Sequence, residues 1–426
     1  MSKIPLVFLS VLVVASFIFI STTISALVFR VDFSGSKTAD LPASTFFVDS
    51  ITEKSLKKTY ARAKNGGAKA RNVRILIVPG HDRQSWGTQF QGLKEIELNL
   101  EVGEELFRLL EQEPLFDVYL SQTKNGYNPE FLSYFEENRG EIIDFVQEQK
   151  GLMNKFLSTG EIHSTVNVIH NDAPNEVALK LYGINKWANE NEIDIVIHIH
   201  FNDYPGRRAS QPGKYSGFSI YVPESQYSNA RGSKPPAESV HDRLANFYAQ
   251  SNLPIEDGGV VEDQELIAVG SNNTLDGAAM LIEYGYIYEP AFTDPALRSI
   301  VLSDLALQTY LGIIDFFEEG GEGVEIGGFH QTNFLPHKWE SDLADGDGEN
   351  GDGRDVLSLQ TALTLEGLYP PPAKLKNDCG LTGYFGPCTE KSVRAFQEKY
   401  GIYPAEGFVG EKTRAKLNEI YGTAIF

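Results

Sequence analysis

From about residue 72 the chain alternates short apolar runs with longer segments of helical periodicity. Helical spacing is seen in residues 95–113, where Leu98, Val102, Leu106 and Leu109 share one face, and again in 175–191 and 295–319. Strands that alternate with helices predict an α/β domain with a mostly parallel central sheet and helices on both faces. The apolar runs that have the length of buried strands are residues 73–80, 116–123, 192–200, 216–223 and 278–285.

The N-terminal segment has a different pattern. Residues 4–29 contain no charged side chain and are long enough to span a hydrocarbon core of ~30 Å. The apolar part exceeds the ~7–15 residues of a cleaved signal core, and Ser25-Ala26 makes a poor cleavage site. We therefore expect an uncleaved membrane anchor over residues 1–29, with a cleaved signal peptide as the alternative; either would export the rest. Residues 30–71 are polar and loosely patterned, which predicts a juxtamembrane stalk.

The domain organisation follows from changes in composition. Residues 72–318 form the predicted α/β domain, with an acidic helical insertion at 129–160. Residues 319–353 are rich in glycine and acidic side chains. The Asp-Gly alternation there resembles a calcium loop in part, but counted from Asp345 it lacks glycine at the sixth position and glutamate at the twelfth, which favours a flexible acidic linker. Residues 354–422 contain three short helical patterns and predict a compact three-helix module.

Charge and cysteine content narrow the possible functions. A net charge of -21 and a pI of about 4.8 argue against nucleic acid as a partner, because nucleic-acid binders carry basic patches. The two cysteines, Cys379 and Cys388, are nine positions apart. In an exported chain this spacing suits one local disulfide, and two unpaired thiols are the alternative.

Three of the predicted strands end in an ionisable residue: His81, His200 and Glu283. In open α/β sheets the carboxyl ends of the strands form the ligand crevice, and Glu95 opens the helix that follows His81. Two histidines and one carboxylate are a common ligand set for a catalytic Zn²⁺ that also binds water. A second carboxylate can then move the proton of that water.

Each of these residues also has an ordinary interpretation. A histidine in a strand can be a core residue, and Glu95 lies among other glutamates, as on a solvated helix face. Glu283 is harder to explain in that way, because a carboxylate inside an apolar run is costly to bury unless it is paired or coordinated. His198 shares a strand face with His200 and could be a fourth ligand or a neighbour of the ligands.

The motifs around these residues resemble the zinc-dependent N-acetylmuramoyl-L-alanine amidases of the Amidase_3 type. In the order of that family they are "VPGH" (78–81), "GLKE" (92–95), "HIHFN" (198–202) and "LIEYGY" (281–286). The resemblance implies that zinc is bound by three side chains and that a fourth is the catalytic acid/base: His81, Glu95, His200 and, as the acid/base, Glu283. It also implies that His198 and Asn202 lie beside the ligands or line the cleft. The chain departs from the family motifs at residues 82–84, Phe201 and Tyr286, which leaves the details of substrate recognition open.

The C-terminal segment is similar to peptidoglycan-binding domain 1, through "TGYFGPCTEKSVRAFQEKYGIYPAEGFVGEKTRAKL" (382–417). Together the two resemblances imply a membrane-tethered enzyme of the cell envelope that cleaves the amide bond between N-acetylmuramic acid and L-alanine of peptidoglycan. Another zinc amidohydrolase or peptidase acting on wall peptides, and a catalytically silent peptidoglycan-binding protein, are the alternatives. An activator protein, and a lid function for 129–160 in place of a plain surface elaboration, stay open.

Overall fold

The structure is a computed structural model that describes residues 47–66, 70–165, 173–204, 206–318, 331–348 and 353–423. The predicted membrane anchor, residues 1–29, lies outside these ranges. Within them, one helix is long and apolar enough to cross a membrane, α8 (Pro295–Phe317), and 72% of its apolar window is buried inside the protein. Asp304, in the middle of α8, is fully buried and accepts hydrogen bonds from Tyr248 Oη at 2.8 Å and from Thr332 Oγ1 and Asn333 N at 2.7 Å each. Helix α8 is thus a core helix with one buried, fully engaged carboxylate.

The central sheet has six strands in the order β4-β1-β7-β10-β8-β9. Strands β4, β1, β7 and β10 are parallel to one another, whereas β8 is antiparallel to β10 and β9 is parallel to β8. The prediction of a mostly parallel sheet is confirmed, and β9 is a strand that the sequence pattern did not predict. The strands are β1 (Val73–Pro79), β4 (Phe116–Leu120), β7 (Ile195–Asn202), β8 (Ser219–Pro223), β9 (Val260–Asp263) and β10 (Ala278–Tyr286).

Helices cover both faces of the sheet, because the side chains of the strands alternate between two apolar cores. Ile195, Ile197 and Ile199 of β7 belong to the core formed with α2 (Glu95–Leu110), α6 (Ala230–Phe247) and α8. Val196 belongs to the core formed with α5 (Asn175–Glu190) on the other face. By the same alternation, His198 and His200 lie on the α5 face.

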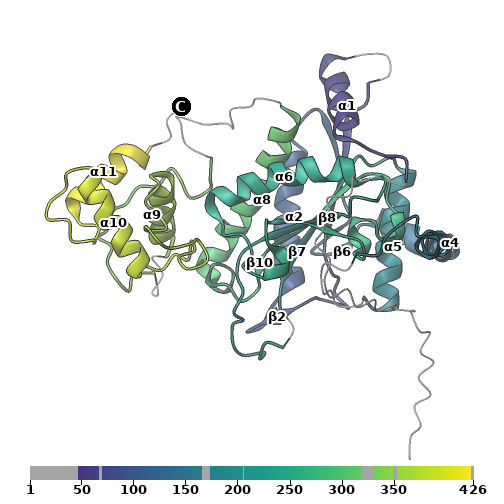
Figure 1. Cartoon of the computed structure of the whole chain (residues 1–426). Coiled ribbons are helices and arrows are strands. Elements are labelled where there is room, and N and C mark those ends of the chain that lie inside the picture. Colours follow the sequence, from purple (N-terminus) through teal and green to yellow (C-terminus); the bar gives the residue numbers. More distant parts are fainter. Residues whose placement is uncertain are drawn as a thin grey trace, which may run out of the picture. The chain divides into compact units, whose positions relative to one another are not determined.

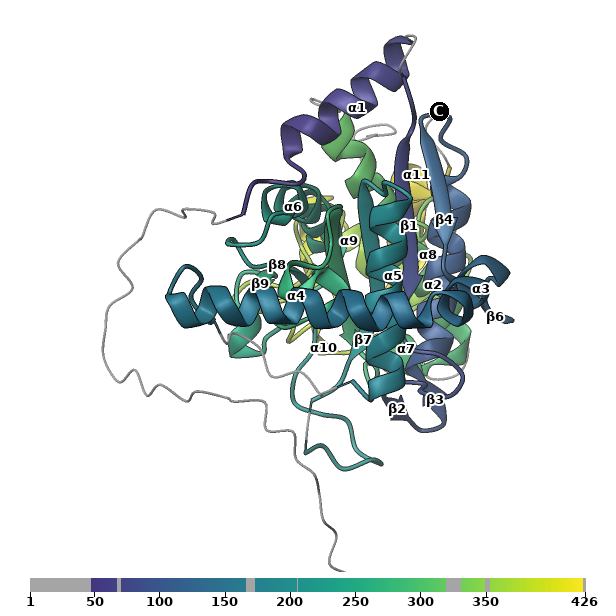
Figure 2. The same cartoon turned by 90° about the vertical axis from the view of Figure 1, so that its right-hand side faces the viewer.

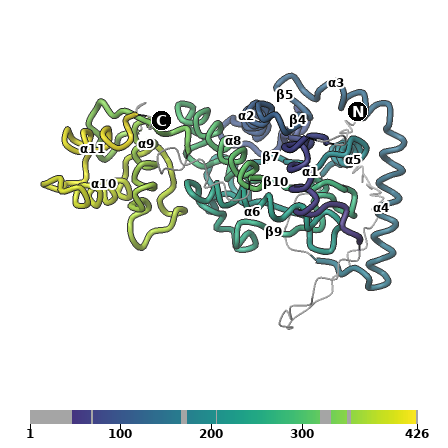
Figure 3. Tube along the Cα trace, turned by 90° about the horizontal axis from the view of Figure 1, so that it is seen from above, coloured from purple at the N-terminus to yellow at the C-terminus, as the bar shows by residue number. Residues whose placement is uncertain are grey.

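The predicted insertion at 129–160 consists of two helices, α3 (Pro129–Glu137) and α4 (Arg139–Thr159). Helix α4 runs across α5 in Figure 2 and lies beside it in Figure 3. The Phe131 ring of α3 is 4.5 Å from the ring of Trp187 in α5, and Arg139 of α4 pairs with Glu176 of α5 at 2.6 Å. The insertion therefore adds a second layer outside α5.

The expectation of a stalk over residues 30–71 is wrong for its later part. Residues 53–65 form helix α1 (Glu53–Asn65), and Leu56 and Tyr60 are buried in the core of the α/β domain. The Tyr60 ring stacks on Phe317 at 4.8 Å, and Lys64 pairs with Glu318 at 2.7 Å. Two buried side chains in a helix rich in lysine are too few to make a visible apolar stripe, which is why the periodicity did not reveal this helix.

The C-terminal module is built from α9 (Gly353–Leu365), α10 (Pro387–Lys399) and α11 (Glu411–Tyr421), which pack around Phe385, Val393 and Phe396 (Figure 1). Cys379, in the loop before α10, is joined by a disulfide to Cys388, the second residue of α10, with an S–S distance of 2.07 Å. The module begins earlier than predicted: Trp339 and Leu343, inside the expected linker 319–353, are both 1% exposed in its core.

The remaining elements are short and connect the main ones. They are β2 (Gln89–Phe90), β3 (Leu93–Lys94), β5 (Gln122–Thr123), β6 (Gly126–Tyr127), α7 (Pro290–Thr293) and the 3₁₀ helices η1 (Pro254–Glu256), η2 (Ile267–Val269) and η3 (Ser271–Asn273).

Candidate active site

His81 follows the end of β1 in a left-handed backbone conformation, with a φ of 67°. This conformation is costly for a residue with a side chain and is found where the surroundings enforce it. The enforcing contact comes from Gln122, whose Nε2 donates to the carbonyl oxygens of Pro79 at 2.6 Å and His81 at 2.5 Å. The turn brings the His81 ring to 5.1 Å from the His200 ring, measured between centroids.

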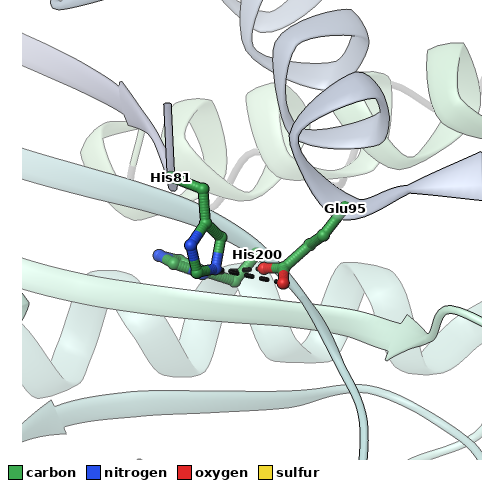
Figure 4. Close-up of side chains that lie close together, drawn as sticks. All are labelled: His81, Glu95 and His200. Atoms are coloured by element: carbon green, nitrogen blue, oxygen red, sulfur yellow. Dashed lines mark hydrogen bonds and ion pairs between the residues drawn. The ribbon is translucent and has the colours of Figure 1, made fainter. Parts of the chain in front are cut away.

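Glu95 is the first residue of α2 and is 4% exposed. Its two carboxylate oxygens contact the two histidines separately: Oε2 is 3.0 Å from His81 Nε2, and Oε1 is 3.0 Å from His200 Nδ1. Figure 4 shows the three side chains converging from the turn after β1, from α2 and from β7. One ligand atom from each lies within 4.8 Å of the others, and this is the group in the described residues that could hold a metal ion.

Two glycines make room for this cluster. At Gly80 a Cβ atom would lie 2.2 Å from the His200 ring, and at Gly87 one would lie 2.2 Å from Glu95 Oε2 and 2.7 Å from His81 Nε2. Any side chain at either position would displace the cluster. The glycine of the "VPGH" motif is therefore required for steric reasons. Gly87 also has a φ of 75°, which glycine adopts without strain.

Two neighbouring residues that the sequence reasoning did not single out form hydrogen bonds that support this cluster. Thr88 donates its backbone N–H to Glu95 Oε2 at 2.9 Å. Asn99, one turn further along α2, is fully buried and donates from Nδ2 to the Gly80 carbonyl at 3.0 Å. A buried asparagine four residues after Glu95 was the available signal for a supporting role, because that spacing places both on one helix face.

The charges in the cluster favour an ionised Glu95. Burial by itself raises its pKa, but the hydrogen bond from His200 and the charge and hydrogen bond of His81 lower it below the usual range. Burial by itself lowers the pKa of His81, and the hydrogen bond and charge of Glu95 raise it above the ordinary value. An anionic carboxylate between two imidazoles is a donor set that fits a zinc ion.

Glu283 lies next to this cluster, opposite His200 in the pairing of β10 with β7. Its Oε2 is buried, and the described residues provide no hydrogen-bond partner for it. Burial raises the pKa of Glu283 well above its ordinary value, and the charges of Glu95 and Glu256 raise it further. A carboxyl group with a raised pKa is suited to accept and return a proton near neutral pH.

His198 and Asn202 flank His200 on the same face of β7, and the structure gives them different surroundings. His198 is fully buried, and burial, followed by the nearby His200, lowers its pKa to about 3, so it is a neutral residue below the cluster. It is not part of the group that could hold a metal ion. Asn202 donates from Nδ2 to Oε1 of Glu256 at 3.1 Å. Glu256, in η1, is 1% exposed, and no sequence motif indicated it.

Comparison with known proteins gives two family matches. Residues 75–315, more than half of the chain, match the family model described as N-acetylmuramoyl-L-alanine amidase. Residues 352–417 match the model described as a putative peptidoglycan binding domain. A probable N-acetylmuramoyl-L-alanine amidase of Bacillus licheniformis is 42% identical over 65 residues, which is 15% of this chain and 18% of that protein. The chain thus spans less than a fifth of the length of this curated relative.

Two solved amidase structures are similar to part of the chain. The N-acetylmuramoyl-L-alanine amidase from Clostridium difficile 630 is 17% identical, with a TM-score of 0.36, over 59% of this chain and 100% of that one. The catalytic domain of CwlV from Bacillus (Paenibacillus) polymyxa var. colistinus is 16% identical, with a TM-score of 0.34, over 57% of this chain and 95% of that one.

Proposed function

The chain belongs to the N-acetylmuramoyl-L-alanine amidase family, and from this premise we propose that it hydrolyses the amide bond between N-acetylmuramic acid and L-alanine in peptidoglycan. The observation that carries the proposal is the convergence of His81, Glu95 and His200 at one end of the sheet, with Glu283 beside them. Three donor atoms and one free carboxyl group are the parts that metal-assisted amide hydrolysis requires.

In this proposal His81, Glu95 and His200 would hold zinc, which when bound polarises the amide carbonyl and acidifies water. Glu283 takes the proton of the attacking water and delivers it to the departing L-alanine nitrogen. Its burial and its raised pKa support both steps, because the carboxyl group can hold the proton between them. Thr88 holds Glu95 in place through its backbone N–H, and Asn99 holds the Gly80 carbonyl in the turn that leads to His81.

The partner and the location follow from the second domain and from the N-terminal segment. We propose that the C-terminal module binds peptidoglycan and raises the local concentration of substrate around the catalytic domain. A substrate in the wall requires an extracytoplasmic catalytic domain, and the uncharged segment 4–29 is suited to tether it to the membrane.

The test uses residues 31–426 and purified peptidoglycan, with and without added Zn²⁺, beside a Glu283→Ala variant. We expect zinc-dependent release of stem peptides that begin with L-alanine, identified by mass, and a loss of about 10²–10⁴-fold in rate for the variant. Peptides cut at another bond would assign the protein to a peptidase class. Pelleting with the wall without any release would identify a silent binding protein.

A further inference from the structure

Glu256 is a buried carboxylate that the proposed reaction does not use. It receives hydrogen bonds from Asn202 Nδ2 at 3.1 Å, from Tyr286 Oη at 3.4 Å, and from Tyr221 Oη. These three donors belong to β7, β10 and β8, the neighbouring strands around Glu283. Glu256 therefore connects the side chains at this edge of the sheet.

The carboxylate determines which way the Asn202 amide faces. The NH₂ group of Asn202 donates to Glu256 Oε1, so the Asn202 Oδ1 atom faces away from Glu256. The described part of the chain offers no donor to Oδ1, and the Asn202 side chain is partly exposed. Asn202 lies two residues after His200 on the same strand face, at the end of β7. Its Oδ1 is thus a fixed acceptor beside the candidate metal ligands.

We propose that Glu256 is a positioning residue that holds Asn202 so that Oδ1 accepts an amide N–H of the substrate. The inference rests on the proposed function, whose substrate has amide N–H groups at the scissile bond and at the next bond of the stem peptide. An acceptor with a fixed orientation distinguishes an N–H from a substituted nitrogen at the same place. A freely rotating asparagine amide would present its donor group as readily as its acceptor.

The experiment measures substrate binding separately from turnover. The parent is the Glu283→Ala protein, and the probes are N-acetylmuramoyl-L-alanyl-D-isoglutamine and two analogues, each N-methylated at one of the two amides. Calorimetry gives Kd for each probe. We expect methylation of one amide to weaken binding to the parent about tenfold, the size expected for losing one hydrogen bond.

Two further variants in the parent background test the positioning. With Asn202→Leu the penalty for methylation should fall below about threefold, since the acceptor is gone. With Glu256→Gln it should fall between the two values, because a glutamine amide can pair with Asn202 in either orientation. The matched control is Glu224→Gln, the same substitution at another buried glutamate. Glu224 follows the last residue of β8, whereas Ser219, which pairs with Glu283, is the first residue of that strand. This control should keep the full penalty.

The outcomes separate the inference from the proposed function. Equal penalties in the parent and in both variants would overturn the inference and leave the amidase proposal standing. No binding of any probe, together with no release of stem peptides by the unmodified protein, would overturn both. If Glu256→Gln does not fold, Asn202→Leu alone decides, because a penalty that survives removal of the acceptor contradicts the inference. In the active protein, Glu256→Gln should raise KM by more than it lowers kcat.

Discussion

The C-terminal module and the catalytic edge of the sheet both bury polar side chains, but they treat them in opposite ways. In the module, buried Gln360 donates to Tyr384 O at 2.9 Å and Thr389 Oγ1 at 3.1 Å, and it accepts from the backbone of two further residues. Buried Gln397 has a similar arrangement: it donates to Phe408 O at 2.8 Å and Thr413 Oγ1 at 3.0 Å, and it accepts from Gly407 N at 2.9 Å. Both amides use their nitrogen and their oxygen to hold loops against helices.

At the catalytic edge, buried polar groups keep donor or acceptor atoms that form no hydrogen bond. Within the described ranges, Glu283 Oε2 and both ring nitrogens of His198 have no hydrogen-bond partner, and His81 has a left-handed backbone. Leaving buried polar groups unpaired costs stability, so a fold keeps such groups where they serve another purpose. In the module the two buried amides hold the architecture, whereas beside the candidate metal ligands Glu283 and His198 keep buried polar atoms without partners among the described residues, as chemistry requires.

The largest expected effect tests the catalytic side of this comparison. Glu95→Gln keeps the shape of the side chain and removes the charge between His81 and His200. We expect zinc affinity to fall by more than about 100-fold, beyond the loss caused by removing a supporting hydrogen bond. Zinc per chain after dialysis, measured by atomic absorption, checks this. Glu101→Gln, an exposed position of the same helix, is the control and should bind zinc normally. Equal zinc content in both variants would remove Glu95 from the metal site.

A smaller effect is expected on the architectural side. Gln397→Leu leaves the Gly407 N–H and the Phe408 carbonyl without their partner, which should cost about 2–4 kcal/mol of module stability. Hydrogen exchange of the full chain should show faster exchange in α10 and α11 and unchanged exchange in α2. The exposed neighbour Glu398→Leu serves as the control. Protection in α10 that does not change would show that the saturated amide does not stabilise the module.

The smallest expected effect is a pH dependence of the stability of the C-terminal module. Burial alone raises the pKa of Glu366, but hydrogen bonds from Lys399, Tyr421 and Tyr400 lower it below the ordinary value of 4.5. Folding therefore favours the ionised form, so this contribution to stability is complete above pH 4.5 and is lost as the pH falls through the lower folded-state pKa. The unfolding temperatures of the unmodified protein and of Glu366→Gln should differ at pH 7 and converge toward pH 3. A difference that is constant with pH would contradict the assignment.

The sequence predicted those parts of the site that depend on local pattern. Apolar runs marked the strands, and their last residues placed His81, His200 and Glu283 at one edge, which the structure reproduces. The alternation along the strand predicted that His198 and His200 share one face. It could not predict which of them contacts Glu95: His200 does, whereas His198, two residues earlier, is buried below the cluster.

Residues that act through distant contacts could not be predicted. Gln122 reaches the turn at His81 from a strand 41 positions later in the chain. Glu256 reaches Asn202 across 54 positions. No periodicity or motif records such a contact, because it exists only once the sheet is assembled. The short strand β9 escaped prediction for a related reason: its four residues, "VVED", are too few to show a period of two.

Asp304 also has a consequence for the export proposed above. A chain that is exported before it folds must pass every segment through a translocation channel, and α8 has the length and hydropathy of a segment that such a channel would release into the lipid. A carboxylate at the centre of a helix opposes that release by about 2.5–3.5 kcal/mol. The residue that anchors Thr332 and Asn333 in the folded state would thus keep α8 out of the membrane on the way there.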